Sequence, residues 1–230
     1  MIMKILVACE FSGVVRRAFR ERGHDAWSCD LLPCSDASPY HIQRDVMSVI
    51  DQGWDMMIAF PPCTYLCGSG MHWTTRGMRD PALTEQAVEF VRTLMIAKIK
   101  RIAIENPIGI ISTRIRKPNQ IIQPYEFGHD ASKRTCLWLD GLTQLRHTKR
   151  VPGRVVCQQC GCASLPGSQD AHDALRYGCG ECGALESKQK ERWSNQTDSG
   201  QNKLGPSDTR WADRSVTYEG IAMAMATQWS

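Results

Sequence analysis

Residues 4–13 read KILVACEFSG, an unbroken apolar run followed by a polar turn. An apolar run such as Ile5–Cys9 is typical of a strand that is buried on both faces. Gly13 ends the turn, and Val14–Phe19 then has apolar side chains at helical spacing. The run is shorter than the apolar core of a secretion signal, and Glu10 follows it at once. This stretch therefore predicts a buried first strand that leads through a turn into a helix.

Strands and helices continue to alternate after this stretch. Further strands are predicted at His24–Asp30, Ile42–Val46, Asp55–Phe60 and Arg101–Ile104. Asp80 and Pro81 have the residue types of a helix N-cap and first position. The helix after them is expected to bury Leu83, Ala87, Phe90, Val91 and Leu94. Alternation at this spacing requires parallel crossovers, so the fold class is α/β with a doubly wound, mostly parallel sheet.

The composition is that of a globular protein. Hydrophobic residues make up 42% and charged residues 23%, which excludes a wholly disordered chain. No apolar run approaches the roughly 18 residues that a membrane span needs, so we expect no membrane partner. The net charge of +4 permits a polyanionic partner. Eleven cysteines without a secretion signal predict a cytoplasmic protein that uses some of them for metal binding or catalysis.

Polar segments follow the predicted strands, where a parallel sheet binds its ligands. These segments are Glu10-Phe11-Ser12-Gly13, Asp30, Asp45, Pro61-Pro62-Cys63 and Glu105-Asn106-Pro107. A nicotinamide-dependent enzyme would have G-x-G-x-x-G after the first strand, whereas only Gly13 is present here. The strand ends therefore bring a thiol, Cys63, and a carboxyl, Glu105, to the same edge of the sheet.

Taken in this order, the segments resemble the DNA cytosine-5 methyltransferases, specifically small phage-type members. The resemblance covers roughly residues 3–146 and 205–229. It implies a Rossmann-like enzyme of a bacterial or phage-infected cell that uses S-adenosylmethionine. The implied cofactor residues are Glu10, Phe11, Ser12 and Gly13 for the methionine end, Asp30 for the ribose, Asp45 for the adenine, and Pro62, Tyr218 and Gly220 around the pocket.

The resemblance also implies a covalent mechanism. Cys63 attacks C6 of cytosine, which makes C5 nucleophilic enough to accept a methyl group. Glu105 offsets the charge that develops on the ring. Asn106 and Arg134 are implied to bind the substrate, and Lys133 takes the base-contacting position. Since this chemistry cannot reach a base inside a duplex, the expected partner is DNA with a flipped or single-stranded cytosine.

Two positions depart from the family pattern. Val15 stands where the family has the second glycine of the cofactor turn. Ser132-Lys133-Arg134-Thr135 stands in place of the family's Gln-x-Arg-x-Arg strand. In a strand Lys133 and Thr135 share one face while Arg134 points away, so Arg134 is also consistent with a solvated or phosphate-facing charge.

A second cysteine pattern lies in the last third of the chain. Cys157-x2-Cys160 is followed, after eighteen intervening residues, by Cys179-x2-Cys182. This is the spacing of a zinc ribbon, and a closed four-thiolate site would be structural. Cys162 and His172 are spare ligand candidates, and Cys162 is an alternative to Cys160 in a shifted register. A pair of disulfides is the competing interpretation.

The position of this ribbon predicts a division of the chain. We expect a catalytic domain at 1–148 plus 205–230 and an inserted ribbon with a polar loop at 149–204. In the family this interval holds the target-recognition region. The polar loop is either a flexible linker or a DNA-contacting segment with Lys188, Lys190 and Arg192 on phosphates.

Three classes of function remain open from the residues alone. The leading one is a DNA cytosine-5 methyltransferase. The second keeps the cysteine and glutamate chemistry on RNA cytosine or on a free nucleotide. The third is a non-enzymatic zinc-ribbon protein that binds nucleic acid. Retention of both Cys63 and Glu105 argues against the third, and the ribbon argues against a free nucleotide. The sequence does not indicate the oligomeric state or the recognised DNA sequence.

Overall fold

The computed structural model describes residues 1–208 and 210–230, without the side chains of Ser69 and Trp211. The chain forms two compact units: residues 1–122, 134–146 and 217–230, called here the sheet unit, and residues 123–133 and 147–216, called the ribbon unit. No helix within the described residues is both long and apolar enough to span a bilayer.

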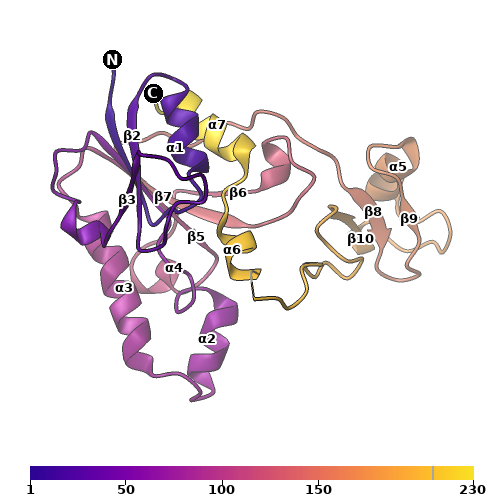
Figure 1. Ribbon diagram of the computed structural model, residues 1–230. Helices are drawn as coiled ribbons and strands as arrows, with labels where there is room; N and C mark the ends of the chain where they lie inside the picture. The colour runs from indigo at the N-terminus through magenta and orange to yellow at the C-terminus, as the bar shows by residue number, and fades with distance from the viewer. Residues whose placement is uncertain (209) are drawn as a thin grey trace. The chain divides into compact units, whose positions relative to one another are not determined.

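The sheet unit contains a seven-stranded sheet with the order β3-β2-β1-β4-β5-β7-β6 (Figure 1). Its strands are β1 (Lys4–Ala8), β2 (Asp25–Asp30), β3 (His41–Gln43), β4 (Met56–Ala59), β5 (Arg101–Pro107), β6 (Gln120–Ile122) and β7 (Thr135–Asp140). The pairs from β3 to β5 are parallel, and β7 runs antiparallel to both of its neighbours. This arrangement is a doubly wound, mostly parallel α/β sheet, which confirms the expected fold class.

Apolar burial holds the centre of this sheet. In β1, Ile5–Ala8 is completely buried, and so is every residue of β4. Leu6 and Ala8 face a core cluster that includes Val88 and Val91 of α3 (Pro81–Met95). The helices α1 (Val14–Arg20) and α7 (Glu219–Gln228) pack together on the other side of the sheet from α3 (Figure 1). The continuous apolar runs of β1 and β4 thus reflect cover on both faces.

Two local predictions need correction. The predicted strand Ile42–Val46 ends earlier, because Asp45 caps the short 3-10 helix η1 (Val46–Ser48) by accepting the N–H of Met47 at 2.9 Å. In α3 the cap by Asp80 is confirmed, but Leu83 lies exposed and Thr84 takes its place in the core. Thr84, Val88 and Val91 form a stripe at helical spacing that is rotated from the predicted face.

Shorter elements complete the sheet unit. They are α2 (Gly68–Thr75) and α4 (Ile111–Arg114), which follow β4 and β5 respectively. At the end of the chain, Ile221, Ala222, Met225 and Trp229 are all buried, so α7 presents one apolar face to the unit.

The ribbon unit has a three-stranded antiparallel sheet with the order β10-β8-β9. Its elements are η2 (Pro124–Glu126), β8 (Arg154–Cys157), β9 (Ala163–Ser164), α5 (Gln169–Tyr177), η3 (Glu186–Lys188), β10 (Gln189–Arg192) and α6 (Arg210–Ser215). The rings of Tyr125 and Trp193 stack with centroids 3.8 Å apart and planes 4° from parallel. Asn195 bonds to both backbone groups of Ser132 at 2.9 Å, which joins the segment 123–133 to the rest of this unit.

Candidate active site and metal site

The turn after β1 is fixed by a buried carboxyl group. Oε1 of Glu10 accepts the N–H of Val15 at 2.8 Å and the hydroxyl of Ser12 at 3.2 Å, which closes the start of α1. Oε2 of Glu10 is buried and, within the described residues, has no hydrogen-bond partner. Burial raises the pKa of Glu10, and the two hydrogen bonds only partly offset this. Cys9, with φ of 57°, adopts the left-handed conformation that this sharp turn requires.

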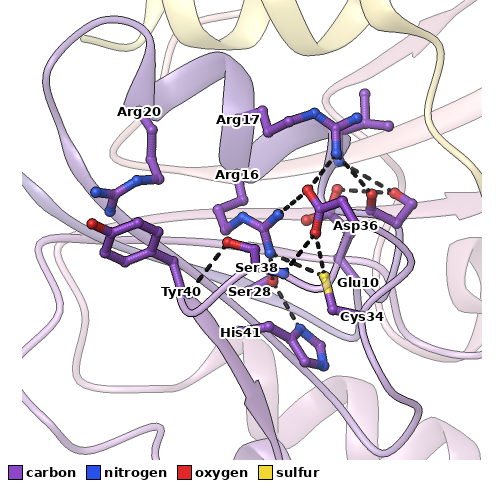
Figure 2. Close-up of polar contacts among 12 residues, drawn as sticks. Glu10, Arg16, Arg17, Arg20, Ser28, Cys34, Asp36, Ser38, Tyr40 and His41 are labelled. Carbon is purple, nitrogen blue, oxygen red and sulfur yellow. Dashed lines mark hydrogen bonds and ion pairs between the residues drawn. The ribbon is translucent and has the colours of Figure 1, made fainter.

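The loop after β2 is tied to the same turn (Figure 2). The side chain of Arg16, only 1% exposed, forms an ion pair with Asp36 and donates to Oγ of Ser28 at 2.8 Å. Arg17 donates both to Asp36 at 2.7 Å and to the carbonyl of Ser12 at 3.1 Å. A Cβ at Gly13 would lie 2.3 Å from Nη2 of Arg16, so the guanidinium fills the space behind the turn.

The carboxylate of Asp36 forms ion pairs with the guanidinium groups of both Arg16 and Arg17. Burial alone would raise the pKa of its carboxyl group, but hydrogen bonds from Cys34, Arg16 and Arg17 outweigh burial and hold the pKa well below its usual range. Sequence analysis missed Arg16 and Asp36. The only signal was a charged residue at 16 between the apolar positions of a helix.

The predicted cofactor residues Asp30 and Asp45 lie at this edge of the sheet. Asp30 accepts the N–H of Leu32 at 2.9 Å, and Asp45 caps η1 as described. The pKa of the Cys9 thiol is raised first by burial and then by the charges of Asp30 and Asp45, which places both carboxylates near the β1 turn. An unpartnered buried carboxyl oxygen and two strand-end carboxylates fit a ligand that brings hydroxyl and cationic groups, as S-adenosylmethionine does.

The remaining predicted cofactor residues lie in the β1 turn, at the start of α7 and in the loop after β4. Phe11 accepts the N–H of Ser35 from the post-β2 loop at 2.9 Å. Tyr218 and Gly220 lie at the start of α7, the helix that packs against α1. Tyr218 is half-buried, and burial raises the pKa of its hydroxyl. Pro62 is exposed in the loop after β4.

The loop that carries Cys63 is held by the segment after β5. Nδ2 of Asn106, which is 1% exposed, donates to the carbonyl of Pro61 at 2.7 Å. The carbonyl of Leu66 accepts the N–H of Ile110 at 2.9 Å, further along the same two segments. A Cβ at Gly109 would lie 1.9 Å from that carbonyl, so only glycine permits this approach. The half-buried thiol of Cys63 thus lies on a loop anchored from both sides.

Glu105 belongs to the strand beside this loop. Ala59 of β4 pairs with Ile104 of β5, so Glu105 follows directly at the carboxyl end of that pair. The pKa of the Cys136 thiol is raised first by burial and then by the charge of Glu105, and Arg134 lowers it. Glu105 and Arg134 therefore both lie close to Cys136 at this edge.

The predicted nucleic-acid contacts differ in their surroundings. Nζ of Lys133 donates to the carbonyl of Arg214 at 2.7 Å, within the ribbon unit. Lys188 and Lys190 are exposed. Arg192 donates to the carbonyl of Asp198 at 3.1 Å and to that of Glu191 at 2.9 Å, which fixes its guanidinium on its own unit.

The ribbon unit brings its cysteine thiols together. Within the described residues, one group of possible metal ligands has all its sulfur atoms within 4.8 Å of one another: Cys157, Cys160, Cys162 and Cys179. Sγ of Cys182 lies 3.8 Å from that of Cys157. Clustered thiolates are the ligands that zinc prefers, so these residues fit a structural zinc ion. His172, the other spare candidate, lines a separate cavity of about 500 Å³ beside α5.

Comparisons with known proteins give similarity at the level of structures. No protein-family model matches the chain, and no curated protein matches it. It is similar to a structure described as a DNA modification methyltransferase encoded within a prophage (E. coli), with a TM-score of 0.41 and 13% identity over 60% of this chain and 46% of that one. It is also similar to the Entamoeba histolytica methyltransferase EhMeth, with a TM-score of 0.45 and 14% identity over 65% of this chain and 58% of that one. The chain thus spans about half the length of each of these two structures.

Proposed function

We propose that the protein transfers a methyl group from S-adenosylmethionine to C5 of cytosine in DNA. The observation that carries this proposal is the anchoring of the Cys63 loop by Asn106, the residue next to Glu105. It joins a thiol-bearing loop to a carboxyl-bearing strand at the edge where a sheet of this order binds its ligands. The carboxylates of Asp30 and Asp45 lie at the same edge, beside the β1 turn.

Cys63 acts as the nucleophile in this proposal. Its thiolate adds to C6 of the cytosine ring, and C5 becomes enamine-like and accepts an electrophile. S-adenosylmethionine, when bound, supplies the methyl group as that electrophile. Loss of the C5 proton then restores the ring double bond and expels the Cys63 thiolate.

Glu105 stabilises the cytosine ring while Cys63 attacks it. In its protonated form it shares its proton with ring N3 while Cys63 attacks, which limits the negative charge that develops on the ring. Asn106 keeps the nucleophile loop in register with Glu105, and Arg134, near the same carboxyl group, attracts a phosphate of the strand that carries the base. Cytosine reaches these groups only when it is flipped out of a duplex or single-stranded.

The ribbon unit is proposed to engage DNA. Its exposed Lys188 and Lys190 provide phosphate contacts, and the net charge of +4 suits a polyanionic partner. Zinc is proposed to hold the cysteine turns of this unit folded, since the buried cluster at these turns consists of cysteines and Ala184.

The test is mass spectrometry of nucleosides after incubation of the purified protein with DNA and isotopically labelled S-adenosylmethionine. We expect labelled 5-methylcytosine with the native protein and none with Cys63→Ser, because a hydroxyl is a much poorer nucleophile at C6. Cys67→Ser is the matched control, since Cys67 lies in the same loop at the N-cap of α2, where serine is favourable. Label on RNA but not on DNA, or unchanged turnover in Cys63→Ser, would overturn the proposal.

A further inference from the structure

The ribbon unit contains two cysteine-bearing turns, residues 157–162 and residues 179–184, which are called here the first and second knuckle. The two knuckles have the same backbone hydrogen bonds. In the first, the N–H of Cys157 donates to the carbonyl of Cys162 at 2.9 Å, and the N–H of Gly161 donates to the carbonyl of Cys157 at 2.9 Å. Gly161 has a φ of 78°, in the left-handed region that favours glycine. The first knuckle is therefore a closed turn that runs from residue i to residue i+5.

The second knuckle repeats this pattern. The N–H of Cys179 donates to the carbonyl of Ala184 at 2.8 Å, and the N–H of Gly183 donates to the carbonyl of Cys179 at 2.9 Å. Gly183 has a φ of 70°. In this correspondence Cys162 occupies the position of Ala184. The knuckle geometry therefore needs no cysteine at position 162, although the structure places a thiol there.

Sulfur distances lead to the same assignment. A tetrahedral zinc–thiolate site with bonds near 2.3 Å has sulfur atoms about 3.8 Å apart. The Sγ atoms of Cys160 and Cys179 are 3.7 Å apart, and those of Cys157 and Cys182 are 3.8 Å apart. Sγ of Cys162 lies closer, at 3.2 Å from both Cys160 and Cys179. Both of the longer separations match a tetrahedral site, whereas the Cys162 thiol is in closer contact with two of those four thiols.

The exposure of these thiols differs. Cys160 is exposed and Cys162 is half-buried, whereas Cys179 is buried. We propose that Cys162 is an oxidation site, at which a hydroperoxide forms a disulfide between Cys162 and Cys160 and thereby releases the zinc ion. Cys160 is the preferred partner of Cys162, because of the two thiols 3.2 Å from Cys162 it is the exposed one, whereas Cys179 is buried. This inference concerns the ribbon unit alone and does not rest on the methyl transfer proposed above.

The reaction balances in two steps. The Cys162 thiol attacks the hydroperoxide O–O bond and becomes a sulfenic acid, with an alcohol or water as the leaving group. The zinc-bound thiolate of Cys160 then attacks the sulfenic sulfur, forming the S–S bond, and the departing hydroxide takes a proton to become water. In total, two thiols lose two electrons and one hydroperoxide gains them.

Loss of zinc has a structural consequence. The small core of the knuckles contains Cys157, Cys179 and Ala184, with Cys162 and Cys182 packed against it. After Cys160 is oxidised, only three thiolates still bind the zinc ion. When the ion dissociates from them, these turns lose most of the interactions that keep them folded. Oxidation at Cys162 would unfold the knuckles and leave the sheet unit intact.

The experiment uses hydrogen peroxide, a chromophoric zinc chelator and the native protein. We expect one zinc per chain by native mass spectrometry, zinc release on peroxide addition, and a Cys160–Cys162 disulfide by peptide mapping. Cys162→Ala copies the alanine of the second knuckle, so it should retain one zinc and release it at least about tenfold more slowly, because the thiol that the peroxide oxidises first is gone. Cys67→Ser, a thiol of the sheet unit, is the control and should release zinc at the native rate.

Several results would overturn the proposal. Cys162→Ala or Cys162→Ser without zinc would make Cys162 a ligand. Zinc release at the native rate in Cys162→Ala would remove its redox role. Peptide mapping of the native protein requires no variant, and a disulfide that excludes Cys162 or joins it to Cys179 would contradict the assigned pair.

Discussion

The sheet unit and the ribbon unit are held together by different forces. In the sheet unit, Ile5–Ala8 of β1 and all of β4 are completely buried, and one continuous core contains apolar side chains from the strands β1, β2, β4, β5 and β7 and the helices α3 and α4. In the ribbon unit, the core at the knuckles consists of cysteines and one alanine. The difference predicts that apolar burial is sufficient to fold the first unit, whereas the cysteine turns of the second need a metal ion.

The two units also use buried polar groups differently. The sheet unit buries Glu10, Arg16 and Asn106 at the carboxyl edge of its strands, where each fixes a loop. In the ribbon unit the ion pairs, such as Arg154 with Asp198 at 2.8 Å, have one partner exposed to solvent. Buried polar side chains are costly unless partnered, so their concentration at one edge of the sheet supports the proposed position of the active site.

Removal of zinc is the strongest way to separate the two units. A zinc chelator is expected to abolish amide protection from hydrogen exchange in β8 and β10 while β1 and β4 remain protected. Hydrogen exchange with mass spectrometry gives both signals in one sample. Protection of β8 that persists in metal-free protein would show that the ribbon unit folds on apolar contacts after all.

A substitution that creates a cavity in the sheet core tests the same separation of the two units from the other side, by weakening the sheet unit. Ile58 of β4 is completely buried, so Ile58→Ala should lower the free energy of unfolding by about 3 kcal/mol. The zinc content should not change, because Ile58 belongs to the sheet unit and the proposed zinc ligands belong to the ribbon unit. Ile96→Ala is the control, since Ile96 is 79% exposed and its loss should cost less than about 0.5 kcal/mol. Denaturant titration and metal analysis check both parts, and a loss of zinc in Ile58→Ala would contradict the separation.

The polar edge of the sheet unit is tested at Asp36. Asp36→Asn removes the charge that faces the buried Arg16, and the free energy of unfolding at neutral pH should fall by about 2 kcal/mol. The folded-state pKa of Asp36 lies below its unfolded value, so its contribution is complete above about pH 5 and disappears as the pH falls toward the folded-state pKa.

The difference between native protein and Asp36→Asn should therefore shrink as the pH is lowered from 5 toward 2, on the ordinary aspartate pKa of about 3.9. Asp51→Asn, at an exposed position, should show little effect at any pH. A difference between the native protein and Asp36→Asn that stays constant down to pH 2 would show that the Asp36 charge does not stabilise the turn.

The smallest expected effect concerns DNA binding. Lys188→Ala with Lys190→Ala should reduce the salt dependence of DNA affinity by a slope of about 1.8, because each phosphate contact releases close to one counterion. Arg192 is left in place because its guanidinium is bound to backbone carbonyls. The double variant Lys98→Ala with Lys100→Ala changes two exposed lysines of the sheet unit and serves as the control. An equal loss of slope in both pairs would contradict a DNA-binding role specific to the ribbon unit.

Much of the sheet could be predicted because its signal is local. The apolar runs at β1 and β4 indicate burial on both faces, and Asp80 with Pro81 correctly predicts the start of α3. The face of α3 was misjudged at Leu83, because Thr84 is polar by type yet fits the core. Hydrophobic periodicity cannot identify a threonine that packs inward.

The sequence predicts those residues of the candidate site that follow the ends of strands. It does not predict the residues that a loop brings together. Strand ends place Asp30, Cys63 and Glu105 at one edge whatever the loops do. The pairing of Arg16 with Asp36 joins residues twenty positions apart through a loop whose path has no sequence signature. The identity of the ribbon's fifth thiol was equally hidden, since spacing alone leaves Cys160 and Cys162 interchangeable.

The most direct measurement of the proposed chemistry uses DNA that contains 5-fluorocytosine. Cys63 should add to C6 and C5 should accept the methyl group, but fluorine cannot leave as a proton does, so the covalent adduct should persist. With S-adenosylmethionine present, we predict a denaturation-resistant protein–DNA complex whose cross-linked peptide contains Cys63 and which Cys63→Ser does not form. Native protein that methylates ordinary DNA yet gives no such complex, or a cross-link at Cys67, would contradict the proposed role of Cys63.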